Sequence, residues 1–258
     1  MTRIGRKFAE LQAAGRKAFV GFVTAGDPST SRTVELALQL EQAGVDVLEL
    51  GVPFSDPLAD GPVIQRSSER ALRNGVTLTA VLAVVRAIRK QSQLPLVLFS
   101  YFNPLMRYGL ERLCSDACAA GVDGALVTDL PPEEAEEWLR GARAAGLDTI
   151  FLASPTSPEE RLQRVCAAST GFVYAISRMG VTGEQRALSD EALPLVMRVK
   201  ALTQTPVVLG FGLGTPEQVA EAASVADGAV VGSALVRFLE EQPQGDVMER
   251  VRWLKSRM

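Results

Sequence analysis

Eight short apolar runs recur along the chain, and each is followed by turn residues and then by a helix-like stretch. A strand followed by a helix, repeated eight times, predicts parallel strands joined by crossover helices. Because the runs lack polar alternation, both faces of the sheet are expected to be covered. We therefore predict an α/β fold, a single (β/α)8 or TIM barrel spanning residues 1–258. The runs are Ala18–Val23, Val47–Leu50, Pro95–Phe99, Gly124–Val127, Thr149–Ala153, Phe172–Ile176, Pro206–Leu209 and Gly228–Val231.

The junctions between these runs support one repeating architecture. Gly44, Gly121 and Gly146 each follow an alanine and precede a hydrophobic residue and an aspartate. Glycine suits a helix end there, because the residue after a helix often needs a positive φ. The steps after the second and the sixth run are the longest, so we expect extended βα loops 2 and 6. Residues Arg3–Ala14 predict an N-terminal helix that plugs the opposite end of the barrel.

Composition removes several kinds of chemistry. The chain has no histidine, which excludes the commonest metal ligand and the usual base of a hydrolase triad. No lysine falls at the end of an apolar run, so a Schiff-base lysine is not expected. The groups left for catalysis are carboxylates, hydroxyls, backbone amides and arginine.

Charge and cysteine content limit the partners. The net charge of -3 gives no basic field for nucleic acid, and no apolar stretch approaches the roughly 20 residues that cross a bilayer. We expect no targeting segment, and small molecules or other proteins as partners. Cys114, Cys118 and Cys166 are expected to be buried, inert thiols in a reducing cytoplasm. A metal pair at Cys114 and Cys118 lacks further ligands, so no metal site is predicted.

The segment Leu48–Pro62 places one carboxylate in an apolar run and a second in the following loop. Desolvation in the run would raise the pKa of Glu49, whereas Asp60 is expected in a wetter setting. Two acids in different environments suit one proton donor and one charge stabiliser. The alternatives are a Glu49 carboxylate held by a backbone amide, and turn roles for Asp56 and Asp60 beside proline and glycine.

Two glycine clusters precede expected helices, at Gly210–Glu217 and at Gly232–Leu235. Glycine lets backbone N–H groups approach an anion, and a helix N-terminus adds unpaired donors. The loops after strands 7 and 8 of such barrels often form a phosphate site. We therefore expect a phosphate monoester substrate, although either cluster alone could consist of ordinary turn glycines.

Other polar residues near strand ends remain open between core and pocket. Tyr101 and Asn103 follow the third run, and Tyr174 lies inside the sixth. Asp129 is expected at a helix entry, with a pocket position as the alternative. Loop 6, Ser177–Arg186, is polar and hinged by glycines, which suits a closing lid.

Across essentially its full length the chain resembles the α subunit of tryptophan synthase. Segment Leu48–Pro62 is similar to that family's signature without a break. Supporting matches are Phe22–Pro28, Asp129–Pro131, Ser177–Gly183 and Gly210–Gly212. The resemblance implies cleavage of indole-3-glycerol phosphate to indole and glyceraldehyde 3-phosphate. It also implies a β subunit as partner in an α-β-β-α complex, with pyridoxal phosphate in the β subunit and no cofactor in this chain.

The resemblance also assigns roles to individual residues. Glu49 and Asp60 match the catalytic pair, and Tyr174 matches a helper near the site. Thr182 matches the lid residue that contacts Asp60, and Asp56 is a candidate for coupling loop 2 to the partner. The positions that hold the phosphate correspond to Gly183, Gly212, Gly232 and Ser233. Apolar side chains that would hold the indole ring, if they face inward, are Phe22, Leu58, Leu126 and Phe211, and Tyr101 is a further candidate for substrate binding.

Chemistry alone requires an acid for this cleavage, because indole leaves poorly unless its C3 atom is protonated first. Three alternatives stay open at this point. The chain could be a lyase that works alone, or a subunit whose main task is to activate its partner. It could also be another phosphate-binding barrel, such as indole-glycerol phosphate synthase or a sugar-phosphate isomerase, which would ordinarily need a lysine at a strand end.

Overall fold

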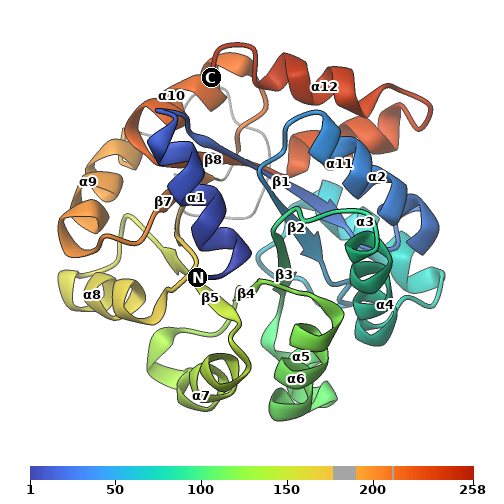
Figure 1. Cartoon of the computed structure of the whole chain (residues 1–258), viewed down its shortest axis with the longest axis horizontal. Helices are drawn as coiled ribbons and strands as arrows, with labels where there is room; N and C mark the ends of the chain where they lie inside the picture. The colour runs from blue at the N-terminus through green and yellow to red at the C-terminus, as the bar shows by residue number, and fades with distance from the viewer. Residues whose placement is uncertain (177–189, 211) are drawn as a thin grey trace.

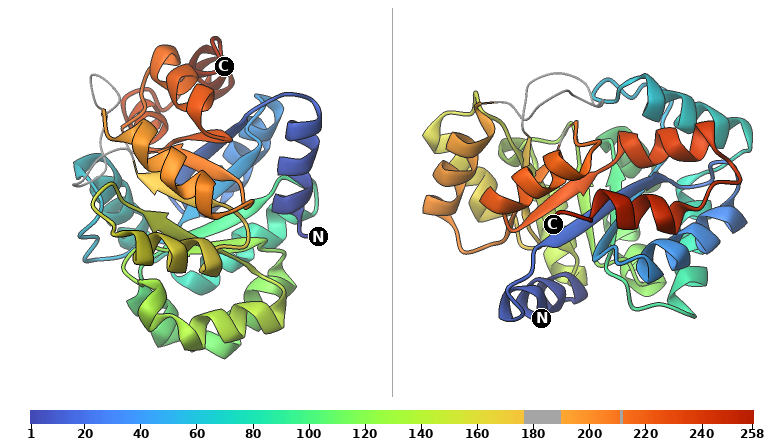
Figure 2. Two further views of the ribbon diagram at one scale, coloured as in Figure 1. Left: turned by 90° about the vertical axis from the view of Figure 1, so that its left-hand side faces the viewer. Right: turned by 90° about the horizontal axis from the view of Figure 1, so that it is seen from above.

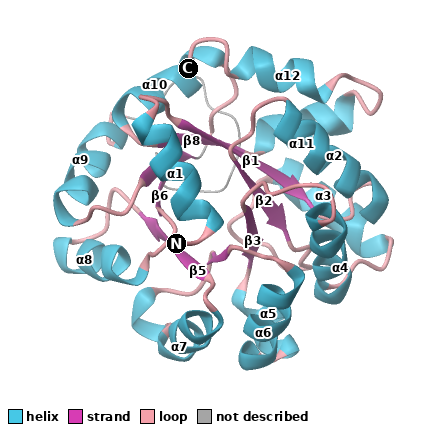
Figure 3. Cartoon of the chain, in the orientation of Figure 1, coloured by secondary structure: helices cyan, strands magenta, loops and turns pink. Residues whose placement is uncertain are grey.

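Eight parallel strands close into a barrel in sequence order, with helices around it (Figures 1 and 3). The computed structural model describes residues 1–176, 190–210 and 212–258. The predicted barrel is confirmed, and each strand begins and ends within one residue of its predicted bounds. The strands are β1 (Ala18–Thr24), β2 (Val47–Gly51), β3 (Leu96–Ser100), β4 (Gly124–Val127), β5 (Asp148–Ala153), β6 (Val173–Ile176), β7 (Val207–Gly210) and β8 (Gly228–Val231).

One helix follows each strand on the outside of the barrel: α2 (Thr30–Gln42), α4 (Leu78–Arg89), α6 (Leu110–Ala120), α7 (Glu136–Ala145), α8 (Glu159–Ala168), α9 (Ala192–Leu202), α10 (Pro216–Val225) and α11 (Ser233–Glu241). Further elements are inserted between them or lie at the two ends of the chain: α1 (Arg3–Ala13), α3 (Pro62–Arg73), α5 (Phe102–Tyr108), η1 (Pro132–Glu134) and α12 (Val247–Leu254).

Helix α1 lies across the amino ends of the strands (Figure 1), as predicted. Its residues Ile4, Phe8 and Leu11 are buried in the same apolar cluster as the inward side chains of the barrel. The ring of Phe8 lies 5.9 Å from that of Phe172. In the right-hand view of Figure 2, α1 and the teal α3 lie at opposite ends of the barrel. The carboxyl ends of the strands are therefore the end left for a site.

The barrel interior is filled from alternate positions of the strands. Val20 and Phe22 of β1 point inward, as do Val97 and Phe99 of β3. Register pairs Phe22 with Glu49, and Glu49 with Val97. Glu49 therefore occupies an inward position that the neighbouring strands fill with hydrocarbon, as its place in the run suggested.

The predicted junction glycines have positive φ, of 95° at Gly44, 96° at Gly121 and 75° at Gly146. The aspartates that follow two of them have a role that the sequence did not reveal. Asp46 accepts the backbone N–H of Phe19 at 2.9 Å, and Asp123 that of Leu96 at 2.8 Å. Each carboxylate thus ties the entrance of one strand to the preceding strand.

Loop 2 is extended, as predicted, and contains the additional helix α3 between β2 and the barrel helix α4. Most of loop 6 lies outside the described residues. Among the described helices none is long and apolar enough to cross a membrane alone; α3 and α4 pass that test only as a pair bent by 95°.

Candidate active site

Glu49 is buried in an apolar barrel interior. Its side chain is 1% exposed, and within the described residues its Oε1 atom has no hydrogen-bond partner. Burial raises the pKa of this carboxyl from 4.5 to about 8, because the charged form loses its hydration. At neutral pH Glu49 therefore holds a proton, and its unpartnered Oε1 atom leaves the carboxyl able to interact with a ligand.

Asp60 lies in loop 2 just before α3, and it is buried as well, at 4% exposed. The wetter setting predicted for it is therefore wrong. Burial raises the pKa of Asp60 to about 6, while a hydrogen bond from the Tyr101 hydroxyl lowers it. Asp60 is thus mainly ionised at neutral pH, and its Oδ1 atom has no partner among the described residues.

Tyr101 connects the end of β3 to loop 2. Its hydroxyl oxygen accepts the backbone N–H of Ala59 at 3.0 Å, and its O–H group donates a hydrogen bond to the Asp60 carboxylate. Burial and the charge of Asp60 raise the pKa of Tyr101 above its ordinary value. The neutral phenol therefore orients Asp60. The sequence had left Tyr101 open between a core and a pocket position and did not indicate this role.

The turn alternative for the loop aspartates does not account for Asp60, whose carboxylate is bound by Tyr101 rather than by a neighbouring backbone amide. Asp56 is exposed on the outer part of the loop. Its carboxylate accepts a hydrogen bond from the hydroxyl of Ser55 at 2.5 Å. Asp56 therefore faces solvent, whereas Asp60 is buried.

A cavity at the carboxyl ends of the strands brings Glu49 together with five predicted binding residues, Phe22, Tyr174, Gly212, Gly232 and Ser233. Its free volume is about 30 Å³, which is about the share of one water molecule in the liquid. The side chains and backbone around it come from Phe22, Glu49, Ile64, Phe99, Tyr174, Gly212, Leu213, Val230, Gly232 and Ser233.

Gly210, the last residue of β7, makes room for Tyr174. A Cβ atom at this glycine would lie 2.4 Å from the Tyr174 hydroxyl oxygen, so any side chain there would displace the ring. Tyr174 is 5% exposed, and burial together with the charges of Glu49 and Asp60 raises its pKa well above 10. Gly210 is thus neither an ordinary turn glycine nor, in its described contacts, part of an anion cradle.

The two predicted phosphate-binding helix starts differ. The N-terminus of α10 is closed by a capping box, in which the Gln218 side chain accepts the backbone N–H of Thr215 at 3.2 Å and the Thr215 hydroxyl accepts that of Gln218 at 3.4 Å. Helix α11 begins at Ser233 after Gly232, without a side-chain cap. Because both residues line the cavity, the open amides at the start of α11 suit an anion there.

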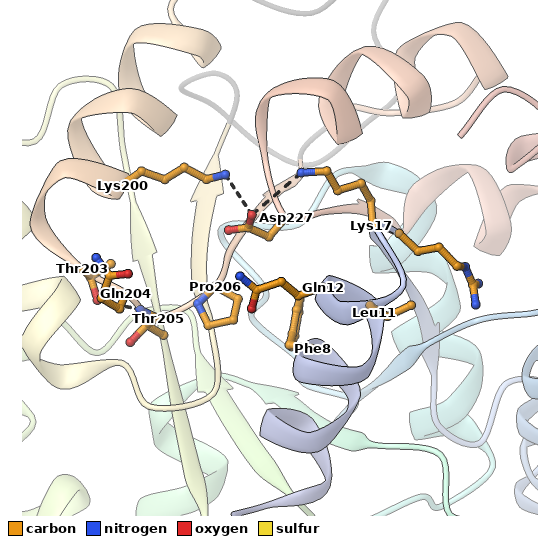
Figure 4. Close-up of a pocket in the computed structure, with 12 residues that line it drawn as sticks. Phe8, Leu11, Gln12, Lys17, Lys200, Thr203, Gln204, Thr205, Pro206 and Asp227 are labelled. Carbon is orange, nitrogen blue, oxygen red and sulfur yellow. Dashed lines mark hydrogen bonds and ion pairs between the residues drawn. The ribbon is translucent and has the colours of Figure 1, made fainter.

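A second cavity, of about 360 Å³, lies at the opposite end of the barrel beside α1. Figure 4 shows Asp227 between the ammonium groups of Lys17 and Lys200, whose Nζ atoms lie 3.9 and 2.9 Å from its Oδ1 atom. Lys17 also donates to the carbonyl of Ala226 at 2.8 Å. These three ionic groups are paired with one another, whereas the cavity at the carboxyl ends of the strands contains Glu49, so we assign the chemistry to that cavity.

Several predicted residues lie elsewhere. Leu58 is 87% exposed, so it does not hold a ring in the cavity, and Leu126 is buried in the inner cluster without lining it. Asp129 caps α5 by accepting the backbone N–H of Phe102 at 2.6 Å. The predicted positions Thr182, Gly183 and Phe211, and the predicted lid, lie outside the described residues.

Cavity residues that the sequence did not single out are Ile64, Phe99, Leu213 and Val230. Apolar residues are too common in such a chain for composition to separate a pocket wall from the core. For Phe99 and Val230, alternation from the inward-facing Glu49 was a usable signal.

The cysteine prediction is wrong in one respect, since Cys118 is exposed, whereas Cys114 and Cys166 are buried. Over the ranges 1–176, 190–210 and 212–258, no group of three or more His, Cys, Asp and Glu residues is placed to hold a metal ion.

Comparison with known proteins gives one consistent family. Residues 8–256 match the family described as Tryptophan synthase alpha chain. The tryptophan synthase alpha chain of Solibacter usitatus is 51% identical over 249 residues, which cover 96% of this chain and 93% of that protein. The structure of Mycobacterium tuberculosis tryptophan synthase matches with a TM-score of 0.92 and 41% identity, over 99% of this chain and 97% of that one. Tryptophan synthase subunit alpha from Legionella pneumophila matches with a TM-score of 0.90 and 37% identity, over 100% and 97% of the two chains. The chain therefore belongs to the tryptophan synthase alpha chain family.

Proposed function

We propose that Glu49 and Asp60 carry the reaction of this family, the cleavage of indole-3-glycerol phosphate to indole and glyceraldehyde 3-phosphate. The observation that carries the proposal is the Glu49 carboxyl, which is buried, unpartnered at Oε1 and protonated at neutral pH. It lies in the wall of the same cavity as the start of α11. A proton donor and an anion site therefore face one ligand.

Glu49 acts first as an acid and then as a base. It gives its proton to C3 of the indole ring, which turns the ring into a good leaving group. The bond between C3 and the glycerol chain then breaks, while the Glu49 carboxylate takes the proton of the adjacent chain hydroxyl as the aldehyde forms. Indole and glyceraldehyde 3-phosphate result, and Glu49 is again protonated. The balance of atoms and protons requires no cofactor in this chain.

Asp60 stabilises the positive charge that develops at the indole N–H when C3 is protonated. An ionised carboxylate suits this role, and the pKa of about 6 leaves Asp60 mainly ionised at pH 7. The hydrogen bond from Tyr101 orients the carboxylate and favours its charged form. Because their pKa values differ, Glu49 can donate a proton at neutral pH while Asp60 stabilises a positive charge.

The phosphate is held by the backbone of Gly232 and Ser233 at the start of α11, with Gly212 beside them. Phe22 and Phe99 support the ring from the barrel interior, where their own rings pack edge to face at 5.2 Å. Thr182, Gly183 and Phe211 remain proposed binding residues, and Thr182 is the proposed link between loop 6 and Asp60.

The partner is a tryptophan synthase β subunit, in an α-β-β-α complex in which pyridoxal phosphate belongs to the β subunit. Solved relatives are structures of tryptophan synthase, which supports a partner of this kind. The exposed Asp56 and Leu58 of loop 2 offer a contact surface directly beside Asp60. The free cysteines support a location in the cytoplasm.

The test is indole release from indole-3-glycerol phosphate by the isolated chain, measured with and without a β subunit. We expect measurable release alone and faster release in the complex. Equal rates in the two conditions would favour a lyase that works alone. Absence of release in both would contradict the proposal.

A further inference from the structure

An ionic cluster ties α3 to two other parts of the fold. Asp27, in the loop after β1, accepts hydrogen bonds from Arg70 Nε at 2.8 Å, from Arg70 Nη2 at 2.7 Å and from the Ser67 hydroxyl at 2.7 Å. The third nitrogen of Arg70 donates to Glu240 of α11 at 2.7 Å. Arg66 donates to the same carboxylate at 2.9 and 2.6 Å. We call these five side chains the α3 clamp.

The clamp is more than an ordinary surface ion pair. The side chains of Asp27 and Glu240 are 12% and 22% exposed, and that of Arg70 is 32% exposed. Arg70 binds Asp27 through two parallel N–H groups, a geometry that fixes direction as well as distance. Hydrogen bonds from Arg66 and Arg70 lower the pKa of Glu240 to about 2, so the Glu240 carboxylate stays ionised near neutral pH.

The position of helix α3 depends on contacts such as these, because α3 is inserted into the loop between β2 and α4. It lies within loop 2 and packs against α11 and β1, outside the ring of helices that alternate with the strands. Its first residue, Pro62, follows Asp60 with only Gly61 between them, and its Ile64 lines the cavity. A shift of α3 is therefore expected to shift the Asp60 carboxylate as well.

The clamp also reaches the helix that is proposed to hold the phosphate. Helix α11 begins at the cavity with Ser233, and Glu240 lies about 10 Å further along it at the rise of an α-helix. Arg70 lies about 12 Å from the start of α3 by the same measure. The two helices therefore both begin near the cavity and are joined about two turns away from it.

We propose that the α3 clamp holds Asp60 at a fixed position relative to a phosphate bound at the start of α11, which makes Asp27, Arg70 and Glu240 positioning residues for the reaction. The inference rests on the roles proposed above for Asp60 and for Ser233. Helix α11 is anchored independently of the clamp, because Ala234, Leu235 and Val236 are buried. Loss of the clamp should therefore move Asp60 and leave the phosphate site in place.

The test compares Asp27→Asn and Glu240→Gln with the control Glu69→Gln in the isolated chain. Both test variants keep the side-chain shape and remove a charge of the clamp. The control removes an exposed ion pair with Arg73, of 3.4 Å, from the same helix. We expect kcat for indole release to fall about ten-fold in both clamp variants and to stay unchanged in the control. The affinity of the clamp variants for sn-glycerol 3-phosphate, a probe of the phosphate site alone, should stay within two-fold of the wild-type affinity.

A pH profile adds a readout that a simple loss of stability would not move. If Asp60 gains water when α3 loosens, its pKa falls and the acid limb of the kcat profile shifts to lower pH. Among the described residues, the ionisable groups that interact with Asp60 are Tyr101 and Tyr174, and neither is changed. Thermal unfolding confirms that each variant is folded at the assay temperature.

Folded clamp variants with unchanged kcat and an unchanged acid limb would overturn the inference, since the clamp would then serve stability alone. A fall in affinity for glycerol phosphate at constant kcat would also overturn it, because the clamp would act on the phosphate site. Asp60→Asn, assayed in parallel, separates the two levels. If that variant keeps full turnover, the proposed role of Asp60 fails; if it is inactive while the clamp variants are fully active, only the clamp inference fails.

Discussion

The hydroxyl of Tyr101 accepts the backbone N–H of Ala59 at 3.0 Å and donates to the carboxylate of the next residue, Asp60. One phenol at the end of β3 thereby holds both the backbone and the side chain of loop 2. The catalytic loop is positioned by a neighbouring strand as well as by its own sequence.

Tyr101→Phe should lower kcat about ten-fold, because a hydrogen bond to a charged group is worth about 1.5 to 3 kcal/mol. The lost bond favoured the charged form of Asp60, so the pKa of Asp60 should rise above its value of about 6. The acid limb of the pH profile for kcat should therefore move to higher pH. A limb that stays in place would show that Tyr101 does not act through Asp60.

Asp60→Asn should lower kcat strongly and leave the Michaelis constant nearly unchanged. The charge that Asp60 stabilises exists mainly in the transition state, so its loss affects the chemical step rather than binding. Steady-state kinetics with indole-3-glycerol phosphate distinguish the two parameters. A rise in the Michaelis constant alone would make Asp60 a binding residue instead.

Gly210→Ala should destabilise the fold by about 1 to 3 kcal/mol, the usual cost of overpacking. The added methyl group would lie 2.4 Å from the Tyr174 hydroxyl oxygen. In a Tyr174→Ala background the same change should cost less, since the space is then free. Denaturant unfolding of the four proteins of this cycle gives the coupling, and equal costs in the two backgrounds would contradict the close contact.

The barrel was predictable from sequence because buried parallel strands are unbroken apolar runs, as in Val47–Leu50. Glu49 could be identified as a candidate site residue for the same reason, since it is a carboxylate within such an apolar run. The burial of Asp60 was not, because it depends on Tyr101 from another strand and on the packing of α3. Contacts between distant segments leave no local pattern.

Two further features of the fold do have a local sequence pattern. Thr215-Pro216-Glu217-Gln218 has the form of a capping box, which would have separated the start of α10 from the open start of α11. Pro62 followed by an amphipathic stretch predicts a helix at α3. The α3 clamp itself had no local signal, because Asp27 and Glu240 are distant in sequence.

The buried Glu49 should make the fold less stable as the pH rises. Its pKa is about 8 in the folded chain and near 4.5 when exposed, so the folded state binds the extra proton between those values. Stability should therefore fall from about pH 4.5 to 8, by up to about 1.4 kcal/mol per pH unit.

Glu49→Gln removes this titration, so the variant should gain stability relative to the unchanged chain as the pH rises from 5 to 8. Urea unfolding of both proteins at several pH values checks the difference. A constant difference would mean that Glu49 does not titrate in this range.

Indole release by Glu49→Gln tests the central claim most directly. Glutamine keeps the shape of the side chain and loses the proton, so turnover of indole-3-glycerol phosphate should fall about 100- to 10,000-fold, while circular dichroism and thermal unfolding show an intact fold. Turnover close to that of the unchanged chain would contradict the assignment of Glu49 as the acid and base of the reaction.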